Sequence, residues 1–91
     1  MALYLVSYDL DKPGQDYPDL ISRLQQLGAR RILYSEWFLI SNASAVAVRD
    51  DLLRYMDAND RILICELKNH AAWQQMMISD ADTLQFFRSA T

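Results

Sequence analysis

The chain has 91 residues, of which 52% are hydrophobic, and its 12 acidic and 9 basic side chains give a formal net charge of −3. This length predicts one domain, and the negative balance excludes a protein whose whole surface attracts phosphate. Because so short a chain buries a limited core, the high hydrophobic content predicts that part of its surface meets a partner.

The first predicted element is an apolar run over residues 2–8 that stops at Asp9. An extended run of aliphatic and aromatic residues is typical of a strand buried on both faces, so Asp9 is expected at the rim of a sheet. The run is about half the length of a membrane span and has no basic lead-in. We therefore expect no membrane partner and a cytoplasmic location.

A turn followed by an amphipathic helix is predicted next. Residues 11–16 contain Pro and Gly, and Asp16 is positioned to cap a helix that starts at Tyr17 or Pro18. Apolar side chains at helical spacing continue to Gly28, which is a typical helix stop.

Residues 30–41 are rich in β-branched and aromatic side chains and predict strand. We interpret them as two short antiparallel strands, 30–34 and 37–41, joined by Ser35-Glu36. Because no Asn-Gly or Asp-Gly turn signal is present, one long bent strand stays open as an alternative.

A second helix is predicted from a cap at Asn42 or Ser44 through Asp57, followed by a strand over residues 61–67. The only cysteine, Cys65, lies inside this strand and is expected to be a small core side chain.

The C-terminal part is predicted to be helical. A short helix is expected from Asn69 on, and a second begins at Ser79, where the spacing to Asp82 resembles a capping box.

The order strand, helix, strand, strand, helix, strand predicts an α+β fold of the ferredoxin-like βαββαβ sandwich type with additional C-terminal helices. Its core would span residues 1–68, and residues 69–91 would form a helical extension packed on the core or on a dimer partner, within one domain. Right-handed crossovers place the two internal helices on the same face of the sheet. The opposite face must then be covered by a second copy or by the C-terminal helices.

Several polar and aromatic residues follow this order in a recognisable pattern: Tyr8-Asp9, Gly28, Arg31, Ser35 and Trp37. Over roughly residues 1–67 the chain resembles the CRISPR-associated Cas-two family, in which a strand ends in Tyr-Asp, a helix ends in glycine and an Arg-x-x-x-Ser-x-aromatic segment follows. It also shares part of this pattern with the virulence-associated protein D RNases, which have a related fold.

The resemblance implies a homodimer in which Asp9 of each subunit meets at a shared cleft. It implies a divalent-metal-dependent endonuclease acting on RNA or double-stranded DNA, with Mg²⁺ or Mn²⁺ bound by Asp9. On this hypothesis Asp9, Arg31 and Ser35 are the catalytic residues: Asp9 binds metal, Arg31 contacts phosphate, and Ser35 supports substrate or metal-bound water. The family also includes non-catalytic bridging proteins that bind a protein partner.

Simpler interpretations stay open for each residue and for the whole protein. Asp9 could be a turn residue, Arg31 could pair with an acid such as Glu36 or Glu66, and Ser35 could only turn the chain. Two other functions are a catalytically inactive protein-interaction module and a small-molecule-binding regulatory domain. Whether the protein is an enzyme is thus undecided by sequence.

Overall fold

Four strands and three helices make up the parts of the chain that the computed structural model describes, namely residues 1–11, 17–68 and 70–90. In chain order they are β1 (Ala2–Asp9), α1 (Pro18–Gln26), β2 (Arg30–Leu33), β3 (Glu36–Ser41), α2 (Ala45–Leu53), β4 (Arg61–Leu67) and α3 (Asp80–Ser89). The protein therefore belongs to the α+β class, as predicted.

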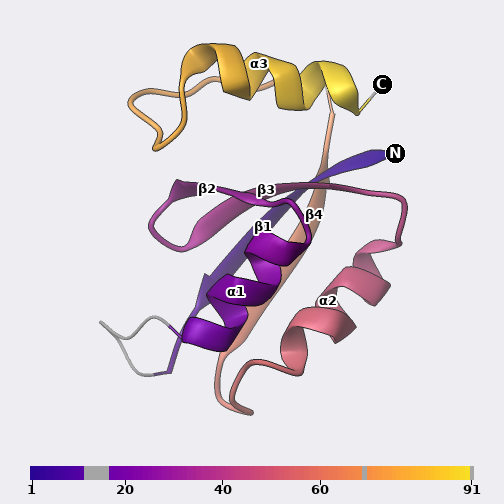
Figure 1. The fold of residues 1–91 in the computed structure, drawn as a ribbon, viewed down its shortest axis with the longest axis vertical. Helices are drawn as coiled ribbons and strands as arrows, with labels where there is room; N and C mark the ends of the chain where they lie inside the picture. Colours follow the sequence, from indigo (N-terminus) through magenta and orange to yellow (C-terminus); the bar gives the residue numbers. More distant parts are fainter. Residues whose placement is uncertain (12–16, 69, 91) are drawn as a thin grey trace.

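The strands form one antiparallel sheet in the order β2-β3-β1-β4. Strand β1 lies inside the sheet, and its residues pair with both neighbours: Ser7 lies opposite Glu36 of β3, and Asp9 lies opposite Arg61 of β4. Helices α1 and α2 lie beside each other on one side of the sheet, and α3 lies apart from them (Figure 1).

Strand β1 is buried on both faces, which confirms the sequence prediction. Tyr4, Val6 and Tyr8 belong to the core beneath α1 and α2, whereas Leu3 belongs to a second cluster on the opposite face. Successive side chains of a strand point to opposite faces, so Asp9 shares the face of Leu3.

Helix α1 has the predicted limits. It begins at Pro18, and Gly28 follows its end with φ +84°, a left-handed conformation that glycine adopts without strain. Its apolar side is anchored by Leu20 and Leu24, which are fully buried. The predicted cap Asp16 and most of the predicted turn at 11–16 lie outside the described residues.

Residues 30–41 form two strands, so the alternative of one long bent strand is wrong. The turn falls at Tyr34-Ser35, one residue earlier than predicted, and Glu36 begins β3. Glu36 belongs to the strand because it pairs with Ser7. The hairpin turn also touches β1, since the backbone N–H of Tyr8 donates to the carbonyl of Ser35 at 3.1 Å.

Helix α2 is shorter than predicted. Ser44 is its cap and accepts from the backbone N–H of Ala47, but the helix ends at Leu53 rather than at Asp57. The carboxylate of Asp60 accepts the Asp57 N–H at 2.7 Å, and such side-chain bonds offer the backbone an alternative to helix.

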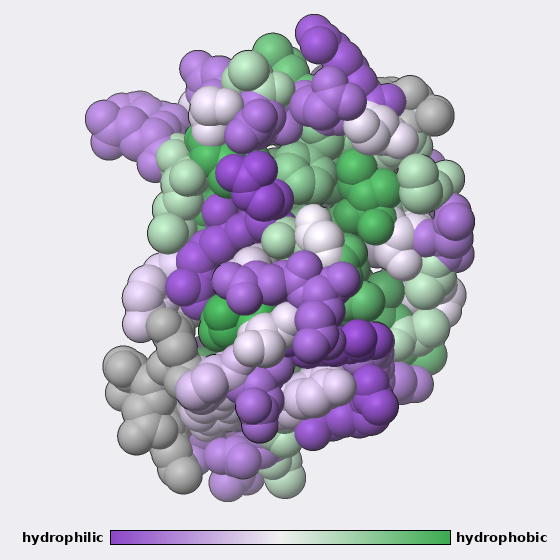
Figure 2. Space-filling view, in the orientation of Figure 1, coloured by the Kyte–Doolittle hydropathy of each residue, from purple (hydrophilic) through white to green (hydrophobic). Residues whose placement is uncertain are grey.

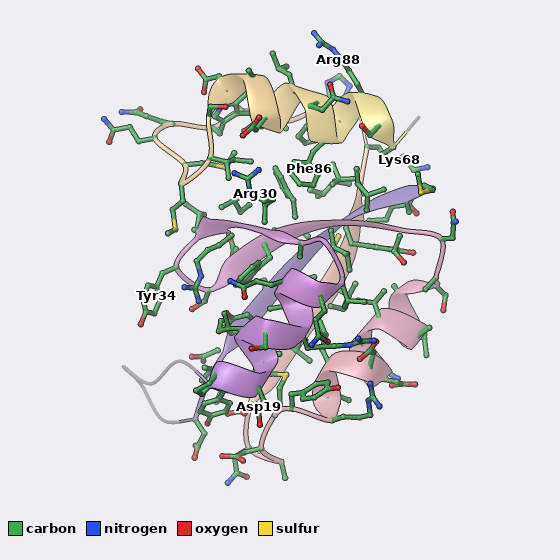
Figure 3. All side chains as sticks on the ribbon, viewed as in Figure 1. Asp19, Arg30, Tyr34, Lys68, Phe86 and Arg88 are labelled. Atoms are coloured by element: carbon green, nitrogen blue, oxygen red, sulfur yellow. The ribbon has the colours of Figure 1, made fainter. Side chains whose placement is uncertain are left out.

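The second face of the sheet is covered in part by α3. Phe86 and Phe87 place their rings 5.5 and 5.7 Å from the ring of Phe38 of β3. Figure 3 shows Phe86 between the helix and the sheet, while Arg88 points away from both. These contacts lie toward the Leu3 end of β1.

Residues 70–79 are extended and bent, so the predicted short helix is wrong for the described part of this segment. Gln75 has φ +54°, which a regular helix cannot contain, and the backbone N–H of Met77 donates to the carbonyl of Ile32 at 2.8 Å. The predicted cap Ser79 is confirmed, because its side chain accepts from the N–H of Asp82 at the start of α3.

Strand β4 is one of the two edge strands of the sheet and has exposed side chains. Cys65 is exposed, contrary to its prediction as a core residue, and Leu63 has 57% of its surface exposed. Both point to the face that carries α3, because they pair with Leu5 and Ser7 of β1. The helix covers the other end of that face and leaves these side chains uncovered. Across the described residues, no helix combines the length and apolar character needed to cross a membrane.

Candidate functional site at the end of strand β1

Asp9 is exposed at the end of β1, as predicted from the apolar run that precedes it. Its side chain is 74% exposed, and its Oδ2 lies 3.6 Å from Nη1 of Arg61, which is 83% exposed. An ion pair so open to water contributes little stability. The Asp9 carboxylate is therefore accessible and could exchange Arg61 for another cation at little cost.

A second carboxylate lies on the same face. Glu36 is directly opposite Ser7, and the Ser7 hydroxyl donates to Glu36 Oε2 at 2.9 Å. Asp9 is two residues beyond Ser7 and so points to the same side. Glu36 and Asp9 are diagonal neighbours across β1 and β3, a relationship that long side chains can bridge.

Ser35 lies in the β2–β3 turn beside this end of β1. Its carbonyl accepts the Tyr8 N–H, so its backbone adjoins the residue that precedes Asp9. A main-chain hydrogen bond thus places the predicted residue Ser35 beside Tyr8, the residue that precedes Asp9.

Arg31 lies on the opposite face of the sheet from Asp9. It is paired in register with Trp37, which is buried in the core beneath α1 and α2, and its guanidinium carbon is 5.0 Å from the centre of the Trp37 ring. Nη2 of Arg31 also donates to the Tyr8 hydroxyl at 3.4 Å. The structure therefore does not bring the Arg31 side chain to the face that carries Asp9.

The loops that flank the site are tied together by Asp60. Its carboxylate accepts from the backbone N–H of Asp11 at 2.6 Å and from the Tyr17 hydroxyl at 3.2 Å. Desolvation, followed by the charges of Asp57 and Asp60, raises the pKa of Tyr17 to about 12. Asp60 consequently holds the chain just after Asp9 and just before Arg61.

The arrangement provides oxygen ligands and one cation on a single accessible face: Ser7, Asp9, Glu36 and Arg61. Among the described residues, no three His, Cys, Asp or Glu side chains gather as a metal-binding group. The face does carry two carboxylates, those of Asp9 and Glu36. Mg²⁺ is commonly held by one or two carboxylates together with water and substrate phosphate. Sequence reasoning missed Glu36 and Arg61 because their place beside Asp9 depends on strand register.

Most cations of the described chain lie close to carboxylates. Ion pairs outside the site include Arg23–Asp51, Arg30–Asp82, Arg49–Asp50, Arg54–Asp51 and Lys68–Glu66. Figure 3 shows Arg30 on the side of the sheet nearest α3 and Lys68 near the chain ends. Positive charge is consequently distributed as local pairs rather than as a broad basic surface.

A separate cavity of about 490 Å³ lies between α3 and the end of β4. Apolar side chains including Leu67, Trp73 and Phe87 line it, with Glu66 and Lys68 among its polar residues. Figure 2 shows apolar surface between α3 at the top and the rest of the molecule, whereas the lower part is largely hydrophilic. This cavity is on the same face as Asp9 but at the opposite end of β1.

No family model matches the chain, and no solved structure matches it.

Proposed function

We propose that the fold is ferredoxin-like and of the Cas-two kind. Two features support this proposal: the strand order β2-β3-β1-β4, and the packing of both α1 and α2 against one core face of an antiparallel sheet. The Tyr8-Asp9 pair at the end of β1 and Ser35 in the β2–β3 turn supply the sequence pattern.

We further propose that the protein is a divalent-metal-dependent endonuclease acting on RNA or double-stranded DNA. The observation that carries this proposal is the placement of two carboxylates, Asp9 and Glu36, at one accessible end of a single sheet face. In the proposed site Asp9 and Glu36 hold Mg²⁺ or Mn²⁺, while the Ser7 hydroxyl orients Glu36 through its hydrogen bond.

Each residue of the site has a defined task. When bound, the cation would activate water and neutralise charge on a phosphodiester. Arg61 would exchange Asp9 for a phosphate oxygen, since its guanidinium is exposed and its ion pair is weak. Ser35 would contact substrate from the turn. Arg31 has no direct task in this site because it lies on the other face, where it packs on Trp37.

The resemblance also implies a homodimer that shares one cation between two Asp9 side chains, and this stays a prediction. In the proposed site, Asp9 and Glu36 of the same chain supply both carboxylates. The site proposed here needs no carboxylate from another copy.

The test is cleavage of labelled RNA and of double-stranded DNA with Mg²⁺ or Mn²⁺ by the purified full chain. We expect Asp9→Asn to abolish cleavage and Glu36→Gln to reduce it at least tenfold, with parallel losses of bound Mn²⁺ measured by electron paramagnetic resonance. Asp19→Asn is the matched control, since Asp19 is exposed in the first turn of α1. Cleavage that survives Asp9→Asn unchanged would overturn the proposal.

The second candidate is a catalytically inactive protein-interaction module. It is favoured by the pairing of cations with carboxylates, because affinity for nucleic acid comes mainly from Lys and Arg that neutralise phosphates. This candidate predicts no metal-dependent cleavage by the wild-type chain and an intact fold in Asp9→Asn.

A further inference from the structure

The cavity between α3 and the end of β4 has the size and lining of a small-molecule site. Its volume is about 490 Å³, and ligand pockets commonly span about 300–1,000 Å³ with mostly apolar walls and a few polar groups. Leu3 and Leu67 line it from the sheet, and Leu84 and Phe87 line it from α3. The cavity is thus walled by both the helix and the sheet.

Helix α3 presents one of its sides to this cavity. Leu84, Phe87 and Ala90 all line it, and residues three apart in a helix lie on the same face. Leu84 is 44% exposed and Phe87 is half-buried. An apolar ligand in the cavity would remove this remaining apolar surface from water, which stabilises the bound state.

Trp73 is an aromatic wall of the cavity that the fold holds in place. Its ring lies 8° from parallel to the ring of Phe87, with the two centres 6.4 Å apart. Nε1 of Trp73 donates to Oδ1 of Asp80 at 2.9 Å, and Phe87 also packs edge-on against Phe38. Because both rings are already held, binding costs little further ordering. Such rings favour an aromatic ligand, since aromatic groups attract one another when offset-stacked or edge to face.

Glu66 and Lys68 are the charged residues of the described lining. They pair with each other, with Lys68 Nζ 3.3 Å from Glu66 Oε2, and their side chains are 46% and 77% exposed. Lys68 comes directly after Leu67, the last residue of β4, so its ammonium lies near the end of the sheet. An ion pair so open to water contributes little stability. A carboxylate brought by a ligand can therefore replace Glu66 as the partner of Lys68 at little cost.

We propose that this cavity binds an aromatic monocarboxylate, a small molecule with an aromatic ring and a short carboxylate arm. The ring lies against Trp73 and Phe87, and the carboxylate pairs with Lys68. The ligand thereby matches both the apolar walls and the one cation of the described lining.

This inference goes beyond the proposed nuclease and does not depend on it. Leu3 lines the cavity at one end of β1, and Asp9 ends the strand six residues later. At about 3.3 Å per residue the two sites are roughly 20 Å apart. Binding of the ligand is therefore expected to be the same in Asp9→Asn as in wild type.

The first test is a titration of the isotope-labelled full chain with hydrocinnamate, a phenyl ring on a short carboxylate arm, followed by NMR. The chain has two tryptophans, and Trp73→Phe identifies the indole N–H signal of Trp73. We expect that signal to shift with half-saturation below about 1 mM. The signal of Trp37 should stay in place, because Trp37 is buried in the core on the other face of the sheet. The absence of a saturable shift at Trp73 would overturn the proposal.

The role of charge is tested with the neutral amide of the same acid. Hydrocinnamamide should bind wild type roughly threefold more weakly than the acid, the size expected for an exposed ion pair. Lys68→Gln should remove this preference, whereas Glu66→Gln should strengthen binding of the acid, because the competing carboxylate is gone. Equal affinities of acid and amide for wild type, or a preference that persists in Lys68→Gln, would refute the proposal.

The location is tested by filling the cavity. Ala71 lines it and is exposed, so Ala71→Phe adds a ring there without disturbing a packed core. We expect this variant to weaken binding by about tenfold or more, since its side chain takes the space of the ligand. The control is Ala72→Phe, because the neighbouring exposed Ala72 is not among the described residues that line the cavity. Unchanged affinity in Ala71→Phe, or equal weakening in both variants, would contradict binding at this place.

Discussion

Arg23 of α1 and Asp51 of α2 form a two-bonded ion pair that joins the helices on the core face. Nε of Arg23 donates to Oδ1 at 2.9 Å and Nη2 donates to Oδ2 at 2.7 Å. Both side chains are about three-quarters buried, with 27% and 23% exposed. Chiefly because Arg23 hydrogen-bonds it, the Asp51 carboxyl has a pKa lowered from 3.8 to about 2.

The first prediction concerns stability against acid. The pKa of Asp51 is lower in the folded chain than in the unfolded chain, so its contribution is complete above about pH 4 and is lost as pH falls toward about 2. We expect Asp51→Asn to reduce the free energy of unfolding at neutral pH by about 1–2 kcal/mol, after allowance for partial exposure. Urea unfolding across this pH range measures it.

The matched control for this change is Asp50→Asn. Asp50 is the adjacent residue, pairs with Arg49 and is 59% exposed, so its removal should change stability little. Equal losses in both variants would show that the ion pair with Arg23 has no special role.

The second prediction concerns the hydrogen bond beneath the Tyr8-Asp9 strand end. Nε1 of Trp37 donates to the Tyr8 hydroxyl at 3.0 Å, and both residues are buried. Tyr8→Phe leaves the indole N–H without this acceptor, which should cost about 1–3 kcal/mol. A double-mutant cycle with Trp37→Phe, measured by urea unfolding, should show coupling.

Tyr34→Phe is the control because Tyr34 is 63% exposed and points outward (Figure 3). If the stability losses of Tyr8→Phe and Trp37→Phe simply add in the double variant, the two side chains do not share a hydrogen bond.

The third prediction concerns the cover provided by α3. Phe86→Ala removes a ring that contacts Phe38 and should cost about 2 kcal/mol, below the range for a fully buried phenylalanine. It should also increase binding of a hydrophobic dye to the uncovered sheet. Leu84→Ala is the comparison, since Leu84 is 44% exposed on the same helix. Equal stability losses and equal dye binding in Phe86→Ala and Leu84→Ala would contradict the covering of the sheet face by α3.

Local signals predicted most of the elements. Gly28 ends α1 because glycine tolerates its positive φ, and Ser44 and Ser79 begin α2 and α3 because their hydroxyls satisfy backbone N–H groups. One error came from a long-range contact, because the N–H of Met77 donates to Ile32 instead of continuing a helix. The early end of α2 has a local cause, since the Asp60 carboxylate accepts the N–H of Asp57 just beyond Leu53.

The candidate site was predicted only in part. Asp9 follows from an apolar run that stops at a carboxylate, and this signal lies within one strand. Arg31 was grouped with it by the resemblance, yet its side chain belongs to the other face, beside Trp37. No local sequence pattern marked Glu36 as a site residue, because its position in the site depends on pairing with Ser7 across the sheet.

The sequence by itself determined the apolar β1 strand, the caps of α2 and α3 and the exposure of Asp9, because periodicity, capping and turn preferences act over a few neighbouring residues. Only the tertiary structure decided which side chains surround Asp9 and which strand edge stays open. Those outcomes depend on the register between distant strands and on where α3 lies on the sheet. For the same reason, the exposure of Cys65 on β4 follows from the packing of a helix formed by residues 80–89.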